Sequence, residues 1–350
     1  MMASTEGIKT NFSNENIRIM ISALYCKGFD TIFGINDSLE FLKTIPSHSI
    51  DLVLSSPPYN IGKAYERNSE MKNYTQYHTK LAREIKRVLR AKGSIAWQVG
   101  NYVRNGSIYP LDILFYRIFV EKFGFELKNR IIWKFEHGLH SKHRLSGRYE
   151  TISWFTRSKN YTFNLDSIRI PQKYPGKRYY KGIKKGQLSG NPLGKNPGDV
   201  WDIVLREWDE QVWDIPNVKA NHPEKTMHPA QFPIELAQRL ILALSNEGDT
   251  VLDPFGGVGS TAIAALSLRR KVISVDKDPE YTKKATERLK ALMNDTLKIR
   301  RIGTRIYVPS MRNNIATVPK EWLTAERDLE TEANSFINYM PNKIYENTQI

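Results

Sequence analysis

Residues 250–276 read TVLDPFGGVGSTAIAALSLRRKVISVD, and this stretch decides the fold class. A short apolar run at Thr250–Leu252 is followed by a glycine-rich turn and then by a helical pattern over Ser260–Leu268. A second apolar run, Lys271–Val275, ends at Asp276. Glycines at a strand-to-helix turn let the backbone turn tightly and approach a ligand closely. The stretch therefore predicts a strand, loop, helix and strand of an open α/β sheet.

The turn itself, Asp253-Pro254-Phe255-Gly256-Gly257-Val258-Gly259, predicts a site for a nucleotide-like cofactor. Asp276 follows at the end of the next strand, roughly 20 residues on, where such folds place an acid that accepts hydrogen bonds from ribose hydroxyls. The turn lacks the Gly-Lys-Ser/Thr ending of a phosphate-binding loop and differs from the dinucleotide fingerprint, which disfavours ATP and NAD. The alternative is a tight turn followed by a solvated aspartate.

Helical and apolar segments alternate through the rest of the chain. The expected additional strands are Thr31–Gly34, Ile50–Leu54, Ser94–Val99, Arg130–Lys134 and Thr151–Phe155. The expected additional helices are Asn14–Gly28, Ser38–Thr44, Tyr74–Leu89 closed by Lys92 and Gly93, Leu111–Phe123, Pro233–Ser245 and Pro279–Met293. Helices between strands imply right-handed crossovers, so the order predicts an α/β fold with a doubly wound, mostly parallel sheet.

Size and composition limit the classes of protein. A chain of 350 residues suits one large domain with an insertion better than a string of modules. Its 52 Lys and Arg against 37 Asp and Glu give a net charge of +15, which favours a polyanionic partner. A single cysteine, Cys26, excludes an internal disulfide framework and a cysteine-based zinc site. Met1–Gly7 lacks the pattern of a secretory signal, so a soluble cytoplasmic protein without a membrane span is expected.

A second motif, Ser56-Pro57-Pro58-Tyr59, stands at the carboxyl end of an apolar strand, where open α/β sheets bind ligands. Proline has no backbone N–H, and its fixed φ holds the Pro57 carbonyl as a rigid acceptor. With the Ser56 hydroxyl, this carbonyl can take both hydrogens of an aromatic amine and make its nitrogen nucleophilic. Tyr59 can stack on a base that has left the duplex. The alternative is a strand terminator followed by a turn.

Ser56–Tyr59 resembles the catalytic tetrapeptide of amino-methyltransferases, and Phe255–Gly259 resembles their Phe-x-Gly-x-Gly cofactor loop. Because the tetrapeptide comes first, the chain resembles the β class of DNA amino-methyltransferases of restriction-modification type. The resemblance implies a Rossmann-like methyltransferase fold, S-adenosyl-L-methionine as cofactor and double-stranded DNA as substrate. It also implies direct methyl transfer to a flipped base, with no metal and no covalent enzyme intermediate. A non-catalytic DNA-binding regulator and an RNA or protein amine methyltransferase are the alternatives.

Two further segments extend the resemblance. Gly34-Ile35-Asn36-Asp37-Ser38 is similar to the family's Gly-Asp-Ser segment, which implies Asp37 as the partner of the cofactor adenine amine, although Asn36 departs from the pattern. His222–Pro233 is similar to the segment that holds the methionine end of the cofactor. The expected cofactor-binding residues are thus Asp37, Lys225, Thr226, Asp253, Phe255, Gly257, Gly259 and Asp276.

The residue at position 56 bears on the target atom. In the family, Ser-Pro-Pro-Tyr is more often found with cytosine N4 and Asp-Pro-Pro-Tyr with adenine N6. Ser56 therefore favours cytosine N4, and adenine N6 is the alternative. Methylation at cytosine carbon 5 is disfavoured, because it needs a cysteine nucleophile. The single cysteine, Cys26, does not follow a proline as a Pro-Cys motif would require.

The region between the two motifs is expected to recognise DNA. A loop-rich basic stretch there contains the expected DNA contacts Lys173, Lys177, Arg178, Tyr179, Lys181, Lys184 and Lys185. A solvated charged loop is the alternative. His137, His140 and His143 recur at intervals of three, but no acidic or cysteine partner completes a metal site.

The motifs also divide the chain. We expect a target-base half at residues 1–166 with the catalytic motif at 55–60, an inserted target-recognition region at 167–221, a cofactor-binding half at 222–293, and a C-terminal extension of unknown role at 294–350. A cognate restriction endonuclease is a partner that the resemblance implies. The sequence leaves monomer or dimer, and the recognised DNA site, open.

Overall fold

The structure is a computed structural model, and its described residues all belong to one compact unit, Met1–Ile306. They are residues 17–60, 70–135, 140–170, 172, 174, 176–201, 218, 222–227 and 231–300. Within these ranges no helix is long and apolar enough to cross a membrane. The expected division into four segments stays a prediction, and most of the C-terminal extension, residues 301–350, lies outside the described residues.

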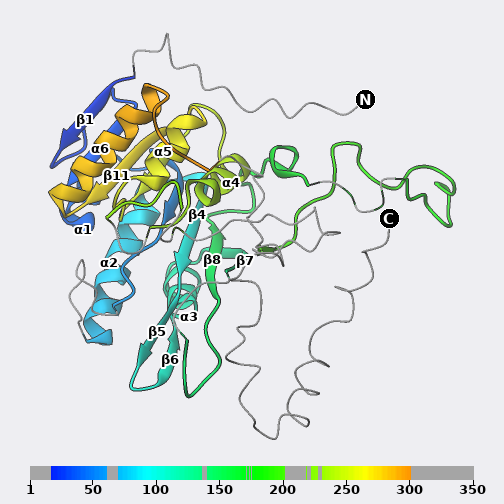
Figure 1. Cartoon of the computed structure of the whole chain (residues 1–350), viewed down its shortest axis with the longest axis horizontal. Coiled ribbons are helices and arrows are strands. Elements are labelled where there is room, and N and C mark those ends of the chain that lie inside the picture. Colours follow the sequence, from blue (N-terminus) through cyan, green and yellow to red (C-terminus); the bar gives the residue numbers. More distant parts are fainter. Residues whose placement is uncertain are drawn as a thin grey trace, which may run out of the picture. The chain divides into compact units, whose positions relative to one another are not determined.

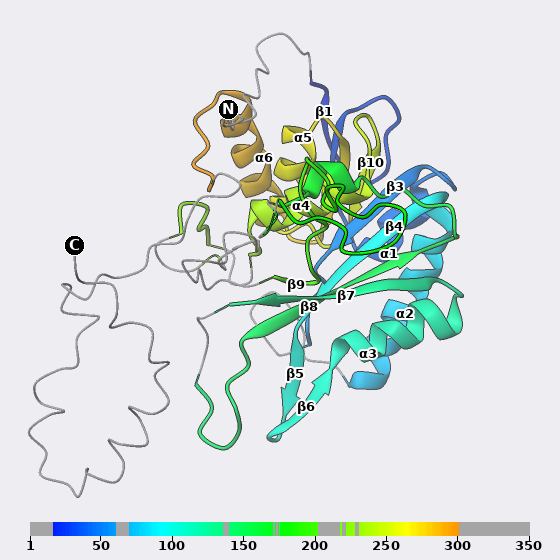
Figure 2. The same cartoon turned by 90° about the vertical axis from the view of Figure 1, so that its right-hand side faces the viewer.

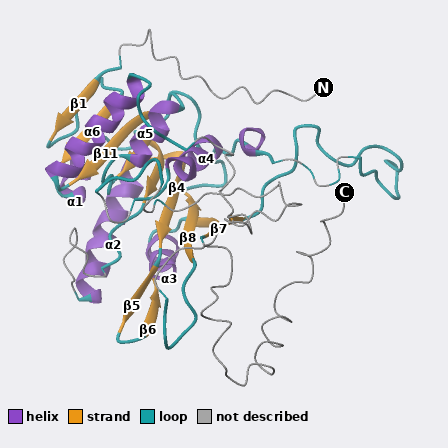
Figure 3. Ribbon diagram, viewed as in Figure 1, coloured by secondary structure: helices purple, strands orange, loops and turns teal. Residues whose placement is uncertain are grey.

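Nine strands form one mixed sheet (Figures 1 and 3). In spatial order they are β1 (Ile19–Ser22), β2 (Thr31–Ile35), β11 (Lys271–Asp276), β10 (Thr250–Asp253), β3 (Ile50–Ser55), β4 (Leu89–Val99), β8 (Tyr149–Thr156), β7 (Glu126–Lys134) and β9 (Val200–Trp201). Neighbours from β1 to β4 are parallel, whereas β8 runs antiparallel to both β4 and β7. The prediction of a mostly parallel sheet is confirmed.

Helices cover both faces of the sheet, as a doubly wound fold requires. One core includes buried side chains of α4 (Ile234–Leu244), α5 (Ser260–Ser267) and α6 (Pro279–Met293). The core on the other face includes buried side chains of α1 (Ser38–Thr44), α2 (Met71–Val88) and α3 (Leu111–Tyr116). Strands β3 and β10 are enclosed between these layers, which explains their nearly continuous apolar sequences.

An antiparallel hairpin of β5 (Asn101–Arg104) and β6 (Ser107–Pro110) follows directly after β4. No pattern in the sequence led us to expect it. In Figure 2 the hairpin projects away from the main sheet, beside the long connection between β7 and β8. Two protrusions therefore extend from the part of the chain between β4 and β8.

Three helix expectations need correction. The described part of Asn14–Gly28 contains the edge strand β1, which pairs in parallel with β2, because β-branched Ile19 and Ile21 extend the sheet rather than a helix. Lys92 and Gly93 lie inside β4, where a Cβ at Gly93 would stand 2.9 Å from the Asp51 carbonyl oxygen, so this glycine permits close strand packing. The helix expected over Leu111–Phe123 is α-helical only to Tyr116 and is π-helical over Arg117–Lys122.

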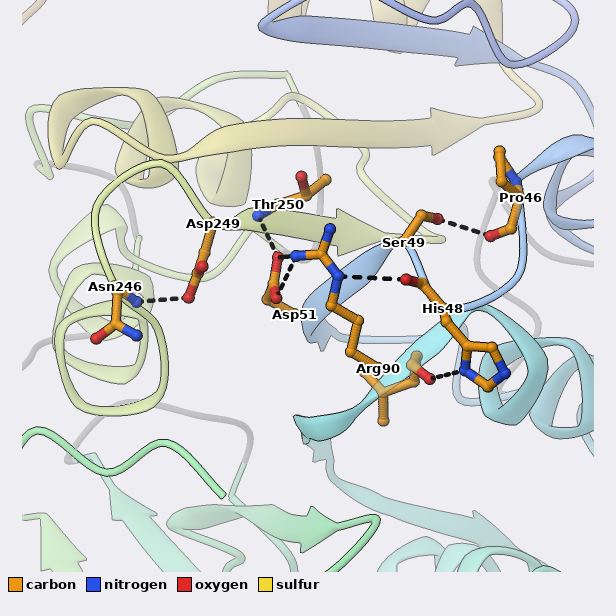
Figure 4. A network of polar contacts seen from close by, with 9 residues as sticks. Pro46, His48, Ser49, Asp51, Arg90, Asn246, Asp249 and Thr250 are labelled. Atoms are coloured by element: carbon orange, nitrogen blue, oxygen red, sulfur yellow. Dashed lines mark hydrogen bonds and ion pairs between the residues drawn. The ribbon is translucent and has the colours of Figure 1, made fainter. Parts of the chain in front are cut away.

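Polar contacts join the amino ends of the central strands (Figure 4). The Asp51 carboxylate on β3 accepts a 2.6 Å hydrogen bond from Arg90 Nη1 on β4 and a 2.9 Å bond from the N–H of Thr250, which begins β10. Arg90 Nε also donates to the His48 carbonyl oxygen at 3.2 Å. Open α/β sheets bind ligands at the carboxyl ends of their strands. This network therefore stabilises the opposite, amino ends of the strands, away from the pocket described next.

Candidate active site

A pocket of about 610 Å³ opens at the carboxyl ends of the parallel strands. It brings together predicted residues from four separate parts of the sequence. Those that line it are Asp37, Ser56, Pro57, Pro58, Tyr59, Phe255, Gly257 and Asp276. The strand order places the tetrapeptide after β3 and the glycine loop after the adjacent β10. The two motifs are therefore neighbours in space.

Asp253 is not among the residues that line the pocket, but its side chain connects the two motifs. It is only 1% exposed, and its Oδ1 accepts a 2.5 Å hydrogen bond from the Ser55 hydroxyl and a 3.1 Å bond from the Phe255 N–H. Burial raises the pKa of Asp253 to about 6. From the sequence this residue was expected among the cofactor ligands, and the structure gives it contacts that support both loops.

The glycine loop is shaped by close backbone approach. A Cβ on Gly256 would stand 1.9 Å from Ser274 Oγ, and Gly259 has a φ of +80°. The Gly257 N–H donates a 2.9 Å hydrogen bond to Asp276 Oδ2, and the Asp278 N–H donates to Oδ1 at the same distance. Burial raises the pKa of Asp276. Its carboxylate is thus fixed by backbone donors at the pocket wall.

The tetrapeptide is held by residues that follow it at a distance in the chain. Ser56 Oγ and the Tyr59 hydroxyl are 3.3 Å apart, and Gln98 Nε2 donates to the same hydroxyl at 3.3 Å. Gln98 Nε2 also donates to Glu150 Oε2. A Cβ on Gly100 would approach Tyr59 Cε2 to 2.9 Å. Sequence patterns did not reveal these three supporting residues, because the end of β4 and the start of β8 meet only in the folded sheet.

Asp37 is positioned by two helices. Its Oδ1 caps α1 by accepting the N–H groups of Leu39 at 2.9 Å and Glu40 at 3.3 Å, while its Oδ2 accepts a 3.0 Å bond from the Tyr77 hydroxyl on α2. Burial and the Asp37 carboxylate raise the pKa of Tyr77, so this phenol stays a donor. Asp37 therefore presents a fixed acceptor at the pocket.

A cluster of aromatic side chains lines the pocket beside the tetrapeptide. His78 on α2 is 3% exposed, and its ring centroid lies 4.3 Å from that of Tyr74 and 5.8 Å from that of Phe255. Burial lowers the pKa of His78 to about 3, so the imidazole is neutral. The Tyr74 hydroxyl donates a 2.7 Å bond to the Pro58 carbonyl oxygen. This contact fixes the second proline of the tetrapeptide.

The segment before α4 reaches the pocket through Gln231 and Phe232. Thr226, an expected ligand, donates a 2.8 Å bond from Oγ1 to Gln231 Oε1, and Gln231 Nε2 donates to the Glu224 carbonyl oxygen at 2.8 Å. Lys225 lies in the same turn, and its N–H donates to the His222 carbonyl oxygen at 3.0 Å. The roles of Lys225 and Thr226 in cofactor binding stay predictions.

The expected DNA-contacting residues lie on an exposed turn away from the pocket lining. Lys177, Arg178, Tyr179, Lys181, Lys184 and Lys185 are all exposed, whereas Lys173 lies outside the described residues. Backbone bonds of 3.0 Å between Tyr179 and both Gly186 and Gln187 hold the turn. Lys184 Nζ stands 5.9 Å from the Tyr179 ring centroid. The cations thus lie together on one hydrogen-bonded turn, which carries a high positive charge.

No metal centre accompanies these features in the described part of the chain, where no group of three or more His, Cys, Asp and Glu residues could hold an ion. His140 and His143 are exposed in the connection between β7 and β8. His137 lies outside the described residues.

Comparison with known proteins identifies the family. The DNA methylase family of N6 and N4 type matches residues 50–287. The chain belongs to this family. It is 46% identical over 246 residues to the Type II methyltransferase M.BglII of Bacillus subtilis, a match that covers 70% of this chain and 65% of that protein. It is 33% identical to the DNA adenine methyltransferase YhdJ of Escherichia coli K12, over 72% of this chain and 80% of the relative.

Solved methyltransferase structures share the fold. PvuII DNA methyltransferase, described as cytosine-N4-specific, superimposes with a TM-score of 0.56 over 79% of this chain and 94% of its own, at 22% identity. TTHA0409 of Thermus thermophilus, in complex with S-adenosyl-L-methionine, gives a TM-score of 0.52 at 25% identity, with 79% and 94% covered. The Rossmann-like methyltransferase fold expected from the sequence is confirmed.

Proposed function

We propose that this methyltransferase transfers a methyl group from S-adenosyl-L-methionine to the exocyclic N4 amine of cytosine in duplex DNA. The observation that carries the proposal is one pocket in which the Ser56 to Tyr59 tetrapeptide faces the Phe255 to Gly257 loop and Asp276. One wall has acceptors for an amine, and the other has the features of a nucleoside site.

The pocket fits the cofactor. Its volume of about 610 Å³ lies within the usual range of roughly 300–1,000 Å³ for small-molecule sites. Asp276 accepts two backbone N–H groups and, as a carboxylate with about four lone-pair sites, can accept ribose hydroxyls as well. Asp37 offers an acceptor for the adenine amine, and Phe255 offers an apolar ring surface. When bound, the cofactor supplies an electrophilic methyl group.

The chain's own residues orient the target amine. The Ser56 hydroxyl and the Pro57 carbonyl are both acceptors, and each takes one hydrogen of the amine, so that the nitrogen lone pair points away from the ring plane. The amine becomes acidic only after it has gained the methyl group, so a strong base is unnecessary. The rate enhancement comes from holding the amine in position to attack the methyl group. Tyr59, held by Ser56 and Gln98, provides the ring on which the flipped base stacks.

Ser56 favours cytosine over adenine as the target. Adenine N6 is the second candidate, and the similarity to the DNA adenine methyltransferase YhdJ favours it. The fold resembles that of a cytosine-N4-specific enzyme, but at 22% identity this likeness concerns the fold alone. The target assignment therefore rests on the seryl hydroxyl at position 56.

One labelling experiment tests the function. Purified protein is incubated with mixed-sequence duplex DNA and methyl-labelled cofactor, and the digested nucleosides are identified by mass spectrometry. N4-methylcytosine is expected, whereas N6-methyladenine would overturn the target atom alone. Label found only in RNA or protein would overturn the DNA substrate. Pro57→Ala should abolish labelling while cofactor binding persists, and the matched control is Pro46→Ala, at the amino side of the same strand.

Membership of a restriction-modification system extends the proposal, because M.BglII and M.HpaI are both named Type II methyltransferases. The expected result is that DNA methylated by this protein resists a cognate endonuclease that cleaves unmethylated DNA. A mapped methylation site provides the substrate for that digestion.

A further inference from the structure

The connection between β7 and β8 carries several cationic side chains and one apolar side chain that is exposed to solvent. Residues 140–148 read HSKHRLSGR and contain no acidic residue. Leu145 is 93% exposed, which ranks it among the most exposed apolar side chains described. Lys142, Arg144 and Arg148 surround it in sequence. A single exposed leucine is ordinary on protein surfaces, so its meaning depends on where this loop lies.

The loop lies beside the carboxyl end of β4, because β8 runs antiparallel to β4 and Thr151, near the start of β8, pairs with Val99. Its carboxyl end continues into β8, where Glu150 contacts Gln98, the residue that donates to the Tyr59 hydroxyl. A Cβ on Gly100 would touch both Tyr59 Cε2, at 2.9 Å, and Glu150 Oε1, at 3.4 Å. The loop is thus joined through a few packed residues to the ring expected to stack on the flipped base.

The base of the loop is fixed, whereas Leu145 lies within a closed turn. The Phe135 N–H donates a 2.9 Å bond to the Arg148 carbonyl oxygen, which prolongs the β7–β8 ladder. The Ser141 N–H donates to Ser146 Oγ at 3.1 Å across the turn. In Figures 1 and 2 this connection projects beside the β5–β6 hairpin, at the same end of the molecule. Leu145 is therefore carried outward on an anchored support.

We infer that Leu145 enters the duplex at the position that the target base leaves, while Lys142 and Arg144 contact the flanking phosphates. Removing a base costs a few kcal/mol of stacking and pairing. Proteins that unstack DNA insert apolar side chains between bases, and cations beside them gain affinity from counterion release. The inference rests on the proposed DNA methyltransferase activity but holds for cytosine or adenine.

The test compares Leu145→Ala with Leu24→Ala. Leu24 is also exposed, at 55%, and follows β1 at the opposite edge of the sheet. Two duplexes carry a site mapped beforehand with wild-type protein: one is fully paired, and in the other the target base faces an abasic position. Single-turnover methylation by Leu145→Ala should fall about 10-fold to 100-fold on the paired duplex. It should change less than about twofold on the unpaired one. Leu24→Ala should match wild type on both.

Other outcomes would overturn the inference. An equal loss on both duplexes would assign Leu145 to folding or general DNA binding, and no loss on either would remove it from the mechanism. A second variant, Arg144→Gln, should lower the slope of log affinity against log salt by about 1 without altering cofactor binding. An unchanged slope would remove Arg144 from the phosphate contacts. Failure of the proposed function is separate, because wild-type protein would then methylate no DNA in the mapping step that precedes this comparison.

Discussion

The Ser55 hydroxyl donates a 2.5 Å hydrogen bond to Asp253 Oδ1 between residues 198 positions apart in the sequence. Ser55 ends β3 and immediately precedes the tetrapeptide, whereas Asp253 ends β10 and immediately precedes the glycine loop. This buried bond therefore links the ends of two adjacent parallel strands at the point where the tetrapeptide and the glycine loop begin. It adds a direct side-chain contact between the two motifs to the pairing of their strands.

Asp253→Asn should change the pH dependence of stability. Burial raises the pKa of Asp253 from 3.8 to about 6, so this group stabilises the fold below about pH 4 and its contribution is lost as pH rises through 6. Asparagine keeps the acceptor oxygen for Ser55 but does not titrate. Between pH 4 and 6.5 the wild type should lose roughly 2 kcal/mol relative to the variant. Urea unfolding followed by circular dichroism measures this difference, and a difference independent of pH would contradict the assignment.

His78→Phe should produce a pH effect of the opposite sign. Burial lowers the pKa of His78 from 6.5 to about 3, so neutral His78 stabilises the fold above pH 6.5 and this contribution is lost as pH falls toward 3. Phenylalanine suits the aromatic surroundings of Tyr74 and Phe115 and does not titrate. The variant should therefore gain stability relative to wild type as pH falls from 6.5 to 4. If the free energy of unfolding fell equally with pH in wild type and variant, His78 would not be the titrating group.

Local signals made much of this fold predictable. The bounds of α1 and α6 agree with those expected from the sequence because their caps are local: Asp37 accepts from Leu39, and Asp278 precedes Pro279 at the first turn. The central strands were found because burial on both faces leaves a continuous apolar run. The edge strand β1 was missed, since one short strand with partial burial has no distinctive period.

The site was predictable where its residues form motifs and unpredictable where it depends on tertiary contacts. Ser56 to Tyr59 and Phe255 to Gly257 meet in one pocket, as their positions after parallel strands imply. Gln98 and Glu150 support Tyr59 from two other strands, and no local pattern marks either one. The segment after α6 was given no role, yet Arg300 contacts both Glu224 and Glu235.

Gly100→Ala should slow methyl transfer by displacing Tyr59. The new Cβ would stand 2.9 Å from Tyr59 Cε2, closer than side-chain carbons approach, so the ring must move. A displacement on the order of 1 Å should lower kcat by about 100-fold, while cofactor affinity measured by calorimetry stays unchanged. A kcat equal to that of wild type would mean that the position of Tyr59 does not limit the reaction.

Glu224→Gln should weaken cofactor binding, although Glu224 is not among the residues that line the pocket. Glu224 is 3% exposed, and its two carboxylate oxygens accept the N–H of Ile234 at 2.9 Å, which begins α4, and the N–H of Arg300 at 3.1 Å. A glutamine has only one acceptor oxygen, so its amide nitrogen must face one of these donors. The variant should lose about 1–3 kcal/mol of unfolding free energy. Cofactor affinity should also fall, because Gln231, which lines the pocket, is held by the Glu224 carbonyl oxygen.

Glu287→Gln controls for the loss of a carboxylate. Glu287 is exposed and pairs with Lys284 at 3.0 Å one turn away on α6, an arrangement that contributes little to stability. Its unfolding curve and its calorimetric affinity should therefore equal those of wild type. If Glu224→Gln unfolded earlier but bound the cofactor as tightly as wild type, the buried carboxylate would stabilise α4 and the Arg300 segment alone. The hydrogen bonds of Glu224 predict that Glu224→Gln loses both stability and cofactor affinity, whereas Glu287→Gln loses neither. The reason is that the Glu224 side chain holds the start of α4, while the same residue holds Gln231 at the pocket through its carbonyl oxygen.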